Sequence, residues 1–557
     1  MAHFHHSTLQ RPSRFNFTRD VVDYWATQQP QLAAMEWISQ DQTDHRRLTY
    51  AYFSERSHRA AILLESLGLR KGDRLILIMP RIPEWWEIAC AAIRAGIVIC
   101  PCTTLAMEKD IEYRVQVSKA KAFVGDEVSM AKFLNIRENC PTVQAMLQTG
   151  DGVLPGTSSY NTGMRQIPEG TTFHAPQFAI DDDCLIYFTS GTTGMPKMVL
   201  HSQISYPLAH AITGKRWLAL EPGQMYWNLS EQGWAKAAWS FFGAWNCGAT
   251  LFIHDDRTAF KPAALQDILH RYPIATLCAP PTVFRQLVSP EYLDRLKQFP
   301  PSALRSCVAA GEPLNAEVVN IWRKATNGID IRDGYGQTET IMVCGNFPGV
   351  PIKPGSMGKP APNVPLTVLN DGREAADGEE GDIALLCDAS DRFFGVFQGY
   401  LSPEGQVKRP QHTTSSGKSW FLTGDRAYRD KDGYFWFVGR SDDIINSSGY
   451  RIGPFEVEST LKEHPAVVES AVVASPDPIR VEVVKAFIVL TPSYAARPDK
   501  EALKAEIQDF CKRKAAPYKY PRKVEFVDAA VLPKTTSGKI KRAVLRSEEF
   551  KAHREKL

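Results

Sequence analysis

Apolar residues recur at alternating helical and strand spacings over the first quarter of the chain. Between residues 60 and 67 they share one helical face, and residues 74–79 form an almost continuous apolar run that predicts a buried strand. A second helix is predicted from 83 to 96, followed by a strand at 97–100. Repeated strand–helix units of this kind predict a parallel sheet covered by helices.

The alternation continues beyond residue 180. The run 184–188 predicts a buried strand, and Ser202 is placed to cap a helix with apolar residues at 204, 208 and 212. The stretch 189–197 between them is rich in hydroxyls and glycine. We therefore predict that this stretch connects a strand to a helix.

The remaining pattern predicts further layers. Apolar runs at 251–253, 275–278 and 304–309 predict a second α/β system, and the turn-rich segment 150–178 predicts a covering loop. Between 352 and 436 the composition changes to glycine, proline, aspartate and short apolar runs, which predicts small β structure in a distorted barrel.

The end of the chain predicts a separate module. Beyond the sequence Gly439-Arg440-Ser441-Asp442-Asp443 we expect, in order, a helix at Pro454, strands at 467–474 and 483–490, a helix at 499–514 and a strand near Val524. The predicted fold class is thus α/β. A large N-terminal domain, 1–440, holds two doubly wound α/β subdomains and the small distorted β-barrel, and 441–557 is a small α+β domain.

Composition limits the classes of partner. At 557 residues with 44% hydrophobic and 23% charged residues, the chain needs two or more domains. A net charge of +3 gives no general argument for nucleic acid or a membrane surface. The longest uncharged stretch, 237–253, contains two glycines and predicts a buried helix turning into a strand rather than a membrane span.

Cysteine usage and the N-terminus indicate the compartment. Eleven dispersed cysteines without a Cys-x-x-Cys pair predict reduced, mostly buried thiols inside a cell. We expect a cytoplasmic protein. Arg11, Arg14 and Arg19 precede the first acidic residue, Asp20, which leaves a short mitochondrial presequence, and hence the matrix, as the alternative.

The stretch 189–197 carries the first chemistry. Glycines at 191 and 194 let successive backbone N–H groups converge on an anion, and the hydroxyls and Lys197 add donors. A polyphosphate is the expected ligand, although an ordinary surface turn also uses glycine, serine and threonine. The stretch is not a Walker loop, because Lys197 lies between Pro196 and Met198 instead of between glycine and a hydroxyl residue.

This stretch resembles the phosphate loop of the adenylate-forming superfamily, which includes acyl-CoA synthetases, luciferases and the adenylation domains of peptide synthetases. Medium-chain acyl-CoA synthetases are the most similar group, and the resemblance extends from about Phe15 to Arg546. It implies ATP and CoA as substrates and Mg²⁺ with the ATP. The catalytic residues that it implies are Lys539, Lys197, Thr192 and Glu339, with Glu339 and Thr192 as metal ligands.

A second motif, Gly334-Tyr335-Gly336-Gln337-Thr338-Glu339-Thr340, resembles the family's next signature. A carboxylate beside a triphosphate repels it unless a divalent cation lies between them, which fits the implied role of Glu339. Taken alone, the motif is equally a loop and a helix start. The ATP-binding residues that the resemblance implies are Thr189, Ser190, Gly191, Thr192, Thr193, Gly194, Lys197, Gly311, Glu312, Asp333, Gly334, Tyr335, Gly336, Gln337, Thr338, Asp425, Arg440, Arg451 and Lys539.

The resemblance also divides labour between the domains. Asp425 and Arg440 would bind the ribose, Asp442 would be the hinge of a mobile C-terminal domain, and Lys539 would bridge acyl carboxylate and α-phosphate. The implied CoA contacts are Ser448, Gly449, Tyr450, Arg480, Lys512, Tyr520, Pro521 and Arg522. A ligand-free hairpin would use the same glycines, and the same cations and aromatics could contact nucleic acid, which the near-neutral charge disfavours.

Two residues bear on the acid substrate. Acetyl-CoA synthetases resemble this chain but carry a tryptophan at the position of Gly336, where it closes the acyl pocket; glycine removes that wall. Trp234 resembles a pocket-lining tryptophan of the medium-chain group, and an ordinary core tryptophan is the alternative. Glu231 and Gln232 depart from the family's usual pattern here.

The resulting hypothesis is an AMP-forming acyl-CoA ligase acting on a medium-chain fatty or small aromatic acid through an acyl-adenylate. Its alternatives are a stand-alone adenylating enzyme that passes the acyl group to a carrier-protein thiol or another acceptor, and a nucleotide-binding regulator without turnover. No membrane span and no nucleic-acid partner are expected. The sequence leaves the oligomeric state open.

Overall fold

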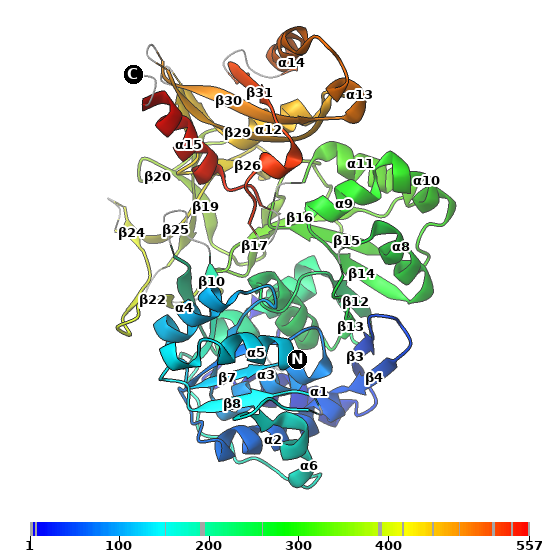
Figure 1. Ribbon diagram of the computed structural model, residues 1–557, viewed down its shortest axis with the longest axis vertical. Coiled ribbons are helices and arrows are strands. Elements are labelled where there is room, and N and C mark those ends of the chain that lie inside the picture. The colour runs from blue at the N-terminus through cyan, green and yellow to red at the C-terminus, as the bar shows by residue number, and fades with distance from the viewer. Residues whose placement is uncertain are drawn as a thin grey trace. The chain divides into compact units, whose positions relative to one another are not determined.

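The computed structural model describes residues 4–5, 8–150, 152–189, 195–258, 260–312, 314–387, 393–414, 417–447, 450–477, 480–514, 519–535 and 539–554 (Figure 1). They form two compact units. The first holds Met1–Pro354, Gly358–Pro365 and Asp388–Pro410, and the second Gly355–Met357, Leu366–Cys387 and Gln411–Leu557. The predicted domain boundary at 440/441 lies inside the second unit and stays a prediction.

The first large sheet confirms the predicted βα alternation. Its inner strands run parallel because helices connect them, and its β11 edge is antiparallel. In order the strands are β23 (Val407–Lys408), β22 (Gly399–Leu401), β11 (Lys197–Ser202), β10 (Asp183–Thr189), β6 (Val98–Pro101), β5 (Arg74–Ile78), β7 (Ala122–Gly125), β8 (Ala145–Gln148) and β9 (Ser158–Ser159).

Helices cover this sheet. Residues of α4 and α5 pack in the same apolar cluster as β5, β6 and β7, and in Figure 1 β7 and β8 lie between α5 and α2. Pro83 opens α3, and Gly96 ends it at φ 74°, where L side chains are strained. The helices are α1 (Asp23–Gln28), α2 (Tyr50–Ser66), α3 (Pro83–Ala95), α4 (Glu108–Ser118), α5 (Glu127–Leu134) and α6 (Tyr160–Gln166), with short turns at Thr18–Val22 and Arg137–Asn139.

The second large sheet is also parallel at its centre and antiparallel at both edges. It confirms the second α/β system, and it includes β3 and β4, which the sequence analysis did not identify. In order the strands are β18 (Lys359–Pro360), β17 (Met342–Gly345), β16 (Ile331–Gly336), β15 (Ser306–Ala310), β14 (Ile274–Cys278), β12 (Met225–Asn228), β13 (Thr250–His254), β3 (Ala33–Ile38) and β4 (His45–Thr49).

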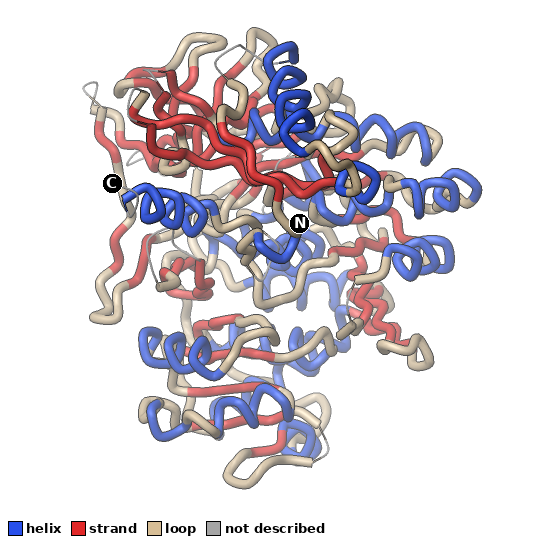
Figure 2. The backbone as a smooth tube through the Cα atoms, turned by 45° about the horizontal axis from the view of Figure 1, so that its top comes forward, coloured by secondary structure: helices blue, strands red, loops and turns tan. Residues whose placement is uncertain are grey.

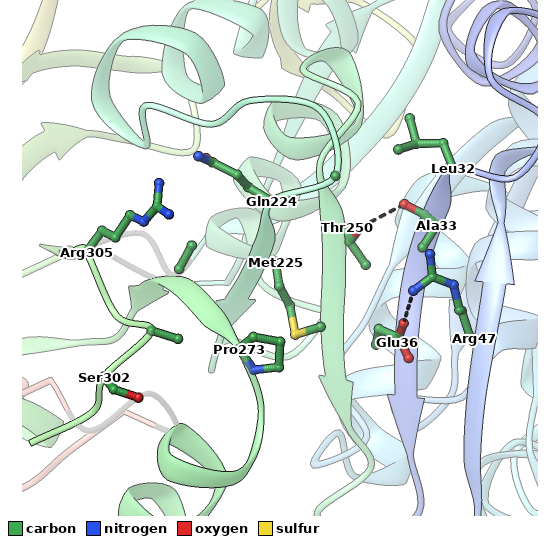
Figure 3. A pocket seen from close by; sticks show the side chains of 13 residues that line it. Leu32, Ala33, Glu36, Arg47, Gln224, Met225, Thr250, Pro273, Ser302 and Arg305 are labelled. Atoms are coloured by element: carbon green, nitrogen blue, oxygen red, sulfur yellow. Dashed lines mark hydrogen bonds and ion pairs between the residues drawn. The ribbon is translucent and has the colours of Figure 1, made fainter. Parts of the chain in front are cut away.

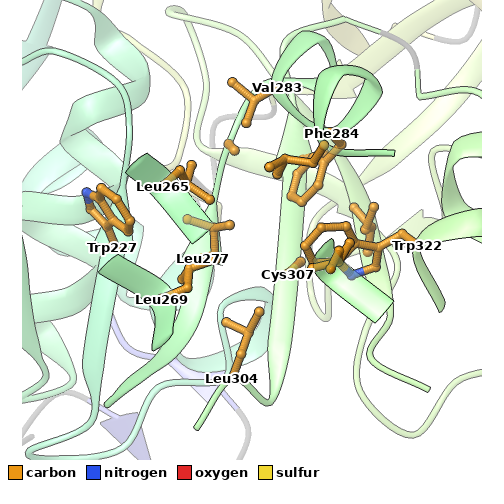
Figure 4. Packing of buried hydrophobic residues seen from close by; sticks show 14 of the residues in the cluster. Trp227, Leu265, Leu269, Leu277, Val283, Phe284, Leu304, Cys307 and Trp322 are labelled. Carbon is orange, nitrogen blue, oxygen red and sulfur yellow. The ribbon is translucent and has the colours of Figure 1, made fainter. Parts of the chain in front are cut away.

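Four helices pack on one face of this sheet. Figure 4 shows their apolar side chains meeting those of the strands, with Phe284 and Trp322 edge to face at a centroid distance of 5.3 Å. The helices are α8 (Pro262–Arg271), α9 (Pro281–Leu287), α10 (Pro290–Gln298) and α11 (Ala316–Ala325). Burying this cluster stabilises the sheet edge whose carboxyl ends carry the nucleotide motif.

Short helical segments, three of them π-helical, lie between strands of the two sheets. They comprise η3 (Ile204–Leu208), α7 (His210–Ile212), η4 (Thr213–Trp217), η5 (Ala235–Ala237) and η6 (Trp239–Ala244). A Cβ on Gly214 would lie 2.0 Å from the carbonyl oxygen of Gly243, so the two segments cross in backbone contact. The uncharged stretch 237–253 is therefore a buried helix leading into β13, as predicted.

Two expectations were wrong. Residues 189–197 connect β10 to the antiparallel strand β11, so the loop joins two strands and not a strand to a helix. The short apolar run at 198–200, buried on both faces, was overlooked as a strand. The helix does begin after Ser202, whose hydroxyl accepts from the Ser205 N–H at 3.1 Å. The covering segment 150–178 contains β9 and α6, the latter too short to show periodicity.

The second unit contains two sheets. One is the predicted small β structure, an antiparallel sheet whose described pairings leave it open, while β22 and β23 join the first large sheet instead. Its strands are β20 (Arg373–Glu374), β19 (Leu366–Asn370), β21 (Glu380–Leu386), β25 (Ser419–Arg429) and β24 (His412–Thr413), with β26 (Phe435–Arg440) paired to β25.

The C-terminal sheet buries alternate residues on its two faces. Val472, Ala474 and Val484 pack with α12 and α14, and Ala471, Val473 and Phe487 pack with α15. Figure 2 shows its long strands with helices beside them. The elements are β27 (Ile445–Ser447), β28 (Tyr450–Ile452), α12 (Pro454–Lys462), β29 (Val467–Asp477), β30 (Val481–Leu490), α13 (Pro492–Ala495), α14 (Lys500–Lys514), β31 (Lys523–Phe526), η7 (Ala529–Val531) and α15 (Arg542–Arg554).

Most predicted elements of this module are confirmed, and α13 and α15 are additional.

No helix among the described residues is long and apolar enough to cross a membrane. None of the eleven cysteines forms a disulfide, and ten of them are buried and Cys387 half-buried, as the sequence predicted. A two-stranded hairpin, β1 (Phe4–His5) and β2 (Thr8–Leu9), begins the chain.

Candidate active site

The phosphate-loop candidates begin where β10 ends. Thr189 is paired with Lys197 across the β10–β11 ladder, so both ends of the intervening loop are fixed. The Tyr113 hydroxyl donates to the Pro196 carbonyl at 2.9 Å and holds the loop's exit. The remaining loop candidates lie outside the described residues: Ser190, Gly191, Thr192, Thr193 and Gly194.

Lys197 and Glu339, from two motifs far apart in the sequence, meet at one tyrosine. The Lys197 Nζ lies 5.0 Å from the centroid of the Tyr400 ring, and the Tyr400 hydroxyl donates to Glu339 Oε1 at 2.8 Å. Lys197 is exposed, whereas Tyr400 and Glu339 are half-buried. One aromatic side chain therefore contacts both a cation and a carboxylate at the edge of the first unit.

Backbone contacts hold the Glu339 segment in place. The Phe397 N–H donates to the Glu339 carbonyl at 2.8 Å, and His201 Nε2 bonds the Thr338 carbonyl at 2.7 Å. Burial lowers the pKa of His201 to about 3, so its ring is neutral and Nε2 carries the proton. The motif is thereby attached to β11 and to the segment that leads into β22.

The start of the same motif is tightly packed. Asp333 within β16 is buried and accepts from the Gly334 N–H at 2.9 Å, and burial raises the pKa of its carboxyl group well above the usual range. A Cβ on Gly334 would lie 2.5 Å from the Trp217 ring, and one on Gly336 would lie 2.5 Å from the Ile341 carbonyl oxygen. Glycine is thus required by the packing at both positions.

The adenine-side candidates lie beyond β15, and a lysine that the sequence analysis did not identify supports them. Gly311 has φ 97° and a Cβ there would lie 2.5 Å from Lys236 Nζ, which donates to the Ala310 carbonyl at 2.7 Å. Glu312 forms an ion pair with Arg285 at 2.8 Å. Lys236 follows half-buried Trp234 by two residues, so the predicted pocket segment also reaches the adenine-side loop.

The unusual Glu231 has a structural role. Its carboxylate accepts from the Thr103 hydroxyl at 2.6 Å and from the Thr104 N–H at 2.6 Å. A Cβ on Gly233 would lie 2.1 Å from the Thr103 nitrogen. The segment before Trp234 is therefore fastened to the residues that follow β6.

In the second unit, the ribose-side candidates and the hinge candidate are brought together. Asp425 and Arg440 are paired across β25 and β26, with Arg440 NH1 3.3 Å from Asp425 Oδ1. The Arg440 Nε lies 3.4 Å from Asp442 Oδ1, and the Arg546 guanidinium donates to the Asp442 carbonyl at 3.0 Å. Asp425 is buried and Arg440 is partly exposed, so the pair combines a buried carboxylate with a partly exposed cation.

Lys539 lies at the end of a narrow hairpin. Its N–H donates to the Thr535 hydroxyl at 3.0 Å, its carbonyl accepts from the Thr535 N–H at 2.7 Å, and its side chain is exposed. Near the hinge, Ser448 and Gly449 lie outside the described residues, and for Tyr450 and Arg451 only the backbone, in β28, is described.

Three of the CoA candidates form one cluster. The centroid of the Tyr520 ring lies 4.8 Å from Lys512 Nζ and 4.9 Å from the guanidinium carbon of Arg522. The Arg522 Nη1 also donates to the Tyr520 hydroxyl at 2.7 Å. The Pro521 carbonyl accepts from the Gln508 side chain at 3.0 Å. Arg480 directly precedes β30, about 13 Å along the chain from Val484, whose carbonyl accepts from the Arg522 N–H. It thus lies at the same end of the module but outside the cluster.

A cavity of about 410 Å³ lies elsewhere in the first unit. Figure 3 shows Arg305 and Arg47 on opposite sides of it, with Met225 and Thr250, the first residues of β12 and β13, in its wall. These are amino ends of parallel strands, whereas ligands of open α/β sheets bind at the carboxyl ends. The cavity is therefore separate from the residues described above.

Comparison with known proteins gives consistent matches. The model of the family described as AMP-binding enzyme matches residues 22–401, and that of the AMP-binding enzyme C-terminal domain matches residues 456–539. The human acyl-coenzyme A synthetase ACSM5, mitochondrial, is 44% identical over 97% of this chain and 91% of its own length. The mouse acyl-coenzyme A synthetase ACSM3, mitochondrial, is 44% identical over 97% of this chain and 92% of its own.

Solved structures agree. The anthranilate CoA ligase AuaEII in complex with anthranoyl-AMP superposes with TM-score 0.83 at 30% identity, covering 98% of this chain and 99% of that one. The Brucella canis acyl-CoA synthetase gives TM-score 0.71 at 32% identity, covering 98% and 96%. Both matches extend across the two units described here.

Proposed function

This chain belongs to the AMP-binding enzyme family and is an AMP-forming acyl-CoA ligase, and on that premise we propose that its acid is a medium-chain fatty acid or a small aromatic acid. The observation that supports the adenylating chemistry most directly is the meeting of Lys197 and Glu339 at Tyr400, and the choice of acid rests on Gly336 and half-buried Trp234. The phosphate-loop lysine and the motif carboxylate thus lie at one edge of the first unit. ATP and CoA are the other substrates.

In the first half-reaction, a carboxylate oxygen of the acid attacks the α-phosphorus of ATP, and the bond to the β-phosphate breaks. Lys197 donates to phosphate oxygens, and buried Asp333 holds the backbone of β16 beside the adenosine. Asp425 accepts the ribose hydroxyls beside Arg440. The products are acyl-adenylate and pyrophosphate.

Glu339 is the residue that would hold Mg²⁺, together with Thr192, which lies outside the described residues. Its half-buried carboxylate is a hard oxygen ligand, and the described residues contain no cluster of three or more metal-ligating side chains. This fits Mg²⁺, which takes one or two carboxylates and completes its shell with phosphate oxygens and waters. Bound Mg²⁺ would neutralise phosphate charge as pyrophosphate leaves.

The second unit supplies the other groups. The exposed Lys539 would bridge the acyl carboxylate and the α-phosphate during adenylation, and rotation about Asp442 would then withdraw it and deliver CoA. The CoA thiol displaces AMP from the acyl-adenylate. The cations around Tyr520 would bind the phosphates of the CoA nucleotide, and Arg480, Arg451 and residues 448–450 would add contacts.

The acid pocket is expected beside Trp234, which is half-buried next to Lys236. Gly336 leaves no tryptophan wall, but its required close approach to Ile341 means that a Gly336→Trp exchange would displace the backbone as well. Trp234→Ala is therefore the sharper probe of the pocket. We expect it to move the preference toward longer acids without changing the ATP KM.

Acid-dependent pyrophosphate exchange with a panel of straight-chain and ring acids tests the proposal. Exchange that peaks at medium-chain or aromatic acids is expected, and CoA-dependent AMP release excludes a stand-alone adenylating enzyme. Lys539→Ala should abolish exchange while sparing thioester formation from supplied acyl-adenylate. Tight ATP binding without exchange for any acid would contradict enzymatic turnover and favour a nucleotide-binding regulator.

We propose a reducing compartment for this enzyme, either the cytoplasm or the mitochondrial matrix, the latter suggested by the location printed for its relatives. The lack of disulfides among the eleven cysteines suits both compartments. Protease protection of the tagged full chain in isolated mitochondria separates the two. Full digestion without detergent would contradict the matrix.

A further inference from the structure

Tyr400 is the residue through which the two catalytic charges of the first unit meet. It lies in β22, a strand that the sequence analysis did not identify, and it pairs with Val199 of β11. Its ring packs edge to face with Phe397 at a centroid distance of 4.9 Å. The side chain is therefore fixed on β22, and the neighbouring strand β11 begins with Lys197.

The hydroxyl of Tyr400 acts on Glu339. It donates to Oε1 at 2.8 Å, and a hydrogen bond to an ionised acceptor is stronger than one between neutral groups. The Glu339 carbonyl is held separately by the Phe397 N–H at 2.8 Å. Backbone and carboxylate of Glu339 are thus fastened by residues three positions apart in one segment, which restrains both the position and the rotation of the carboxylate.

The ring of Tyr400 acts on Lys197. A cation 5.0 Å from an aromatic centroid is attracted by the ring face. This attraction holds the ammonium group of Lys197 near the loop. The hydroxyl and the ring serve different partners. A change that removes only the hydroxyl can therefore separate the two effects.

We propose that Tyr400 is a positioning residue that orients Glu339 for the metal ion of Mg·ATP and, independently, orients Lys197 for the nucleotide phosphates. The inference deepens the proposed function and rests on Glu339 as the metal ligand. A residue that orients a metal ligand typically contributes about 10–100-fold to metal affinity. The hydroxyl should therefore matter for metal-bound ATP, and the ring for ATP with or without metal.

Tyr400→Phe and Tyr400→Leu test this on the full chain by equilibrium calorimetry of ATP binding, with Mg²⁺ or with EDTA. Tyr400→Phe should weaken Mg·ATP binding about 10-fold and raise the Mg²⁺ concentration for half-maximal exchange, while metal-free ATP binding stays unchanged. Tyr400→Leu should weaken both forms. Thermal unfolding of each variant shows whether the fold is retained.

Tyr52→Phe is the matched control. The Tyr52 hydroxyl donates to Glu87 at 2.6 Å, the same pairing in helices α2 and α3, and its loss should leave both binding constants unchanged. Equal weakening of the two ATP forms by Tyr400→Phe would overturn the inference, as would no weakening at all. Wild-type ATP binding that ignores Mg²⁺ would instead contradict the proposed function itself.

Discussion

Two glutamates of the first unit, Glu87 and Glu339, accept hydrogen bonds from tyrosine hydroxyls in different environments. Glu87 in α3 is 1% exposed and accepts from Tyr52 at 2.6 Å, from Tyr160 at 2.5 Å and from Arg56 at 2.8 Å. Glu339 is half-buried in the turn between β16 and β17 and accepts from Tyr400 at 2.8 Å. The first cluster joins three helices, and the second joins a strand to a motif loop.

The two glutamates differ in how deeply they are buried. Glu87 is enclosed, its charge is balanced by Arg56, and burial together with Glu87 raises the pKa of Tyr52 and Tyr160, so both remain donors at every working pH. Glu339 is only half-buried. The same chemical pair therefore stabilises the fold in one place and prepares a ligand in the other.

Glu339→Gln gives the largest expected effect, because it removes the metal-ligating charge without changing shape. Acid-dependent pyrophosphate exchange should fall by about 10³-fold, while the free energy of unfolding changes by less than about 0.5 kcal/mol. Exchange kinetics and urea denaturation on the same preparation measure both. A large loss of stability here would mean that Glu339 behaves like Glu87 and the comparison fails.

Glu87→Gln should do the reverse. It leaves the charge of Arg56 in a mostly buried place without its partner, which should destabilise the protein by about 3 kcal/mol. Urea denaturation measures this, and the exchange rate of the folded variant should equal that of wild type. A fall in exchange with unchanged stability would contradict the structural role given to Glu87.

His201 is buried and bonds the Thr338 carbonyl, next to Glu339, and its titration gives a further test of the comparison. Its pKa in the fold, about 3, lies below the ordinary 6.5, so the fold favours the neutral ring. Its contribution is complete above pH 6.5 and is lost as pH falls toward 3, with a slope of about 1.4 kcal/mol per pH unit. His201→Gln should reduce this acid sensitivity in urea denaturation between pH 4 and 6; an unchanged slope would refute it.

Lys236→Met gives the smallest expected effect. It removes one charged hydrogen bond to the Ala310 carbonyl, beside the adenine-side glycine, while keeping the length of the side chain. ATP affinity should fall about fivefold, or about 1 kcal/mol, in calorimetry. Lys215→Met, which removes a lysine paired with Glu221 on the surface, is the control and should leave affinity unchanged. Equal affinities for the two variants would exclude a role for Lys236.

The sequence predicted most of the fold because continuous apolar runs become buried strands, as in β5 and β6. It missed β11, because Met198, Val199 and Leu200 form a run too short to separate from the following helix. It also missed β3. This strand lies near the start of the chain and pairs with β13, which comes much later, so no local pattern indicates the pairing.

The sequence allowed a site to be proposed where several chemically special residues stand together, as at 189–197 and 334–340, and the roles of these residues stay predictions. Asp425, Arg440 and Asp442 do lie together, and so do Lys512, Tyr520 and Arg522. Tyr400 and Lys236 could not be found, because each is an isolated residue whose role depends on strand pairing or on a neighbouring turn. The spacing of Lys236 from Trp234 was the one available signal.

The state of the thiols has a practical consequence. Burial raises the pKa of Cys102 and Cys278 to about 11, so neither ionises near neutrality, and both are shielded from reagents. Cys387 is the exception, since it is half-buried. A maleimide dye should therefore attach to the native chain at one place, next to β21, giving a fluorescence reporter of the second unit without any engineered cysteine.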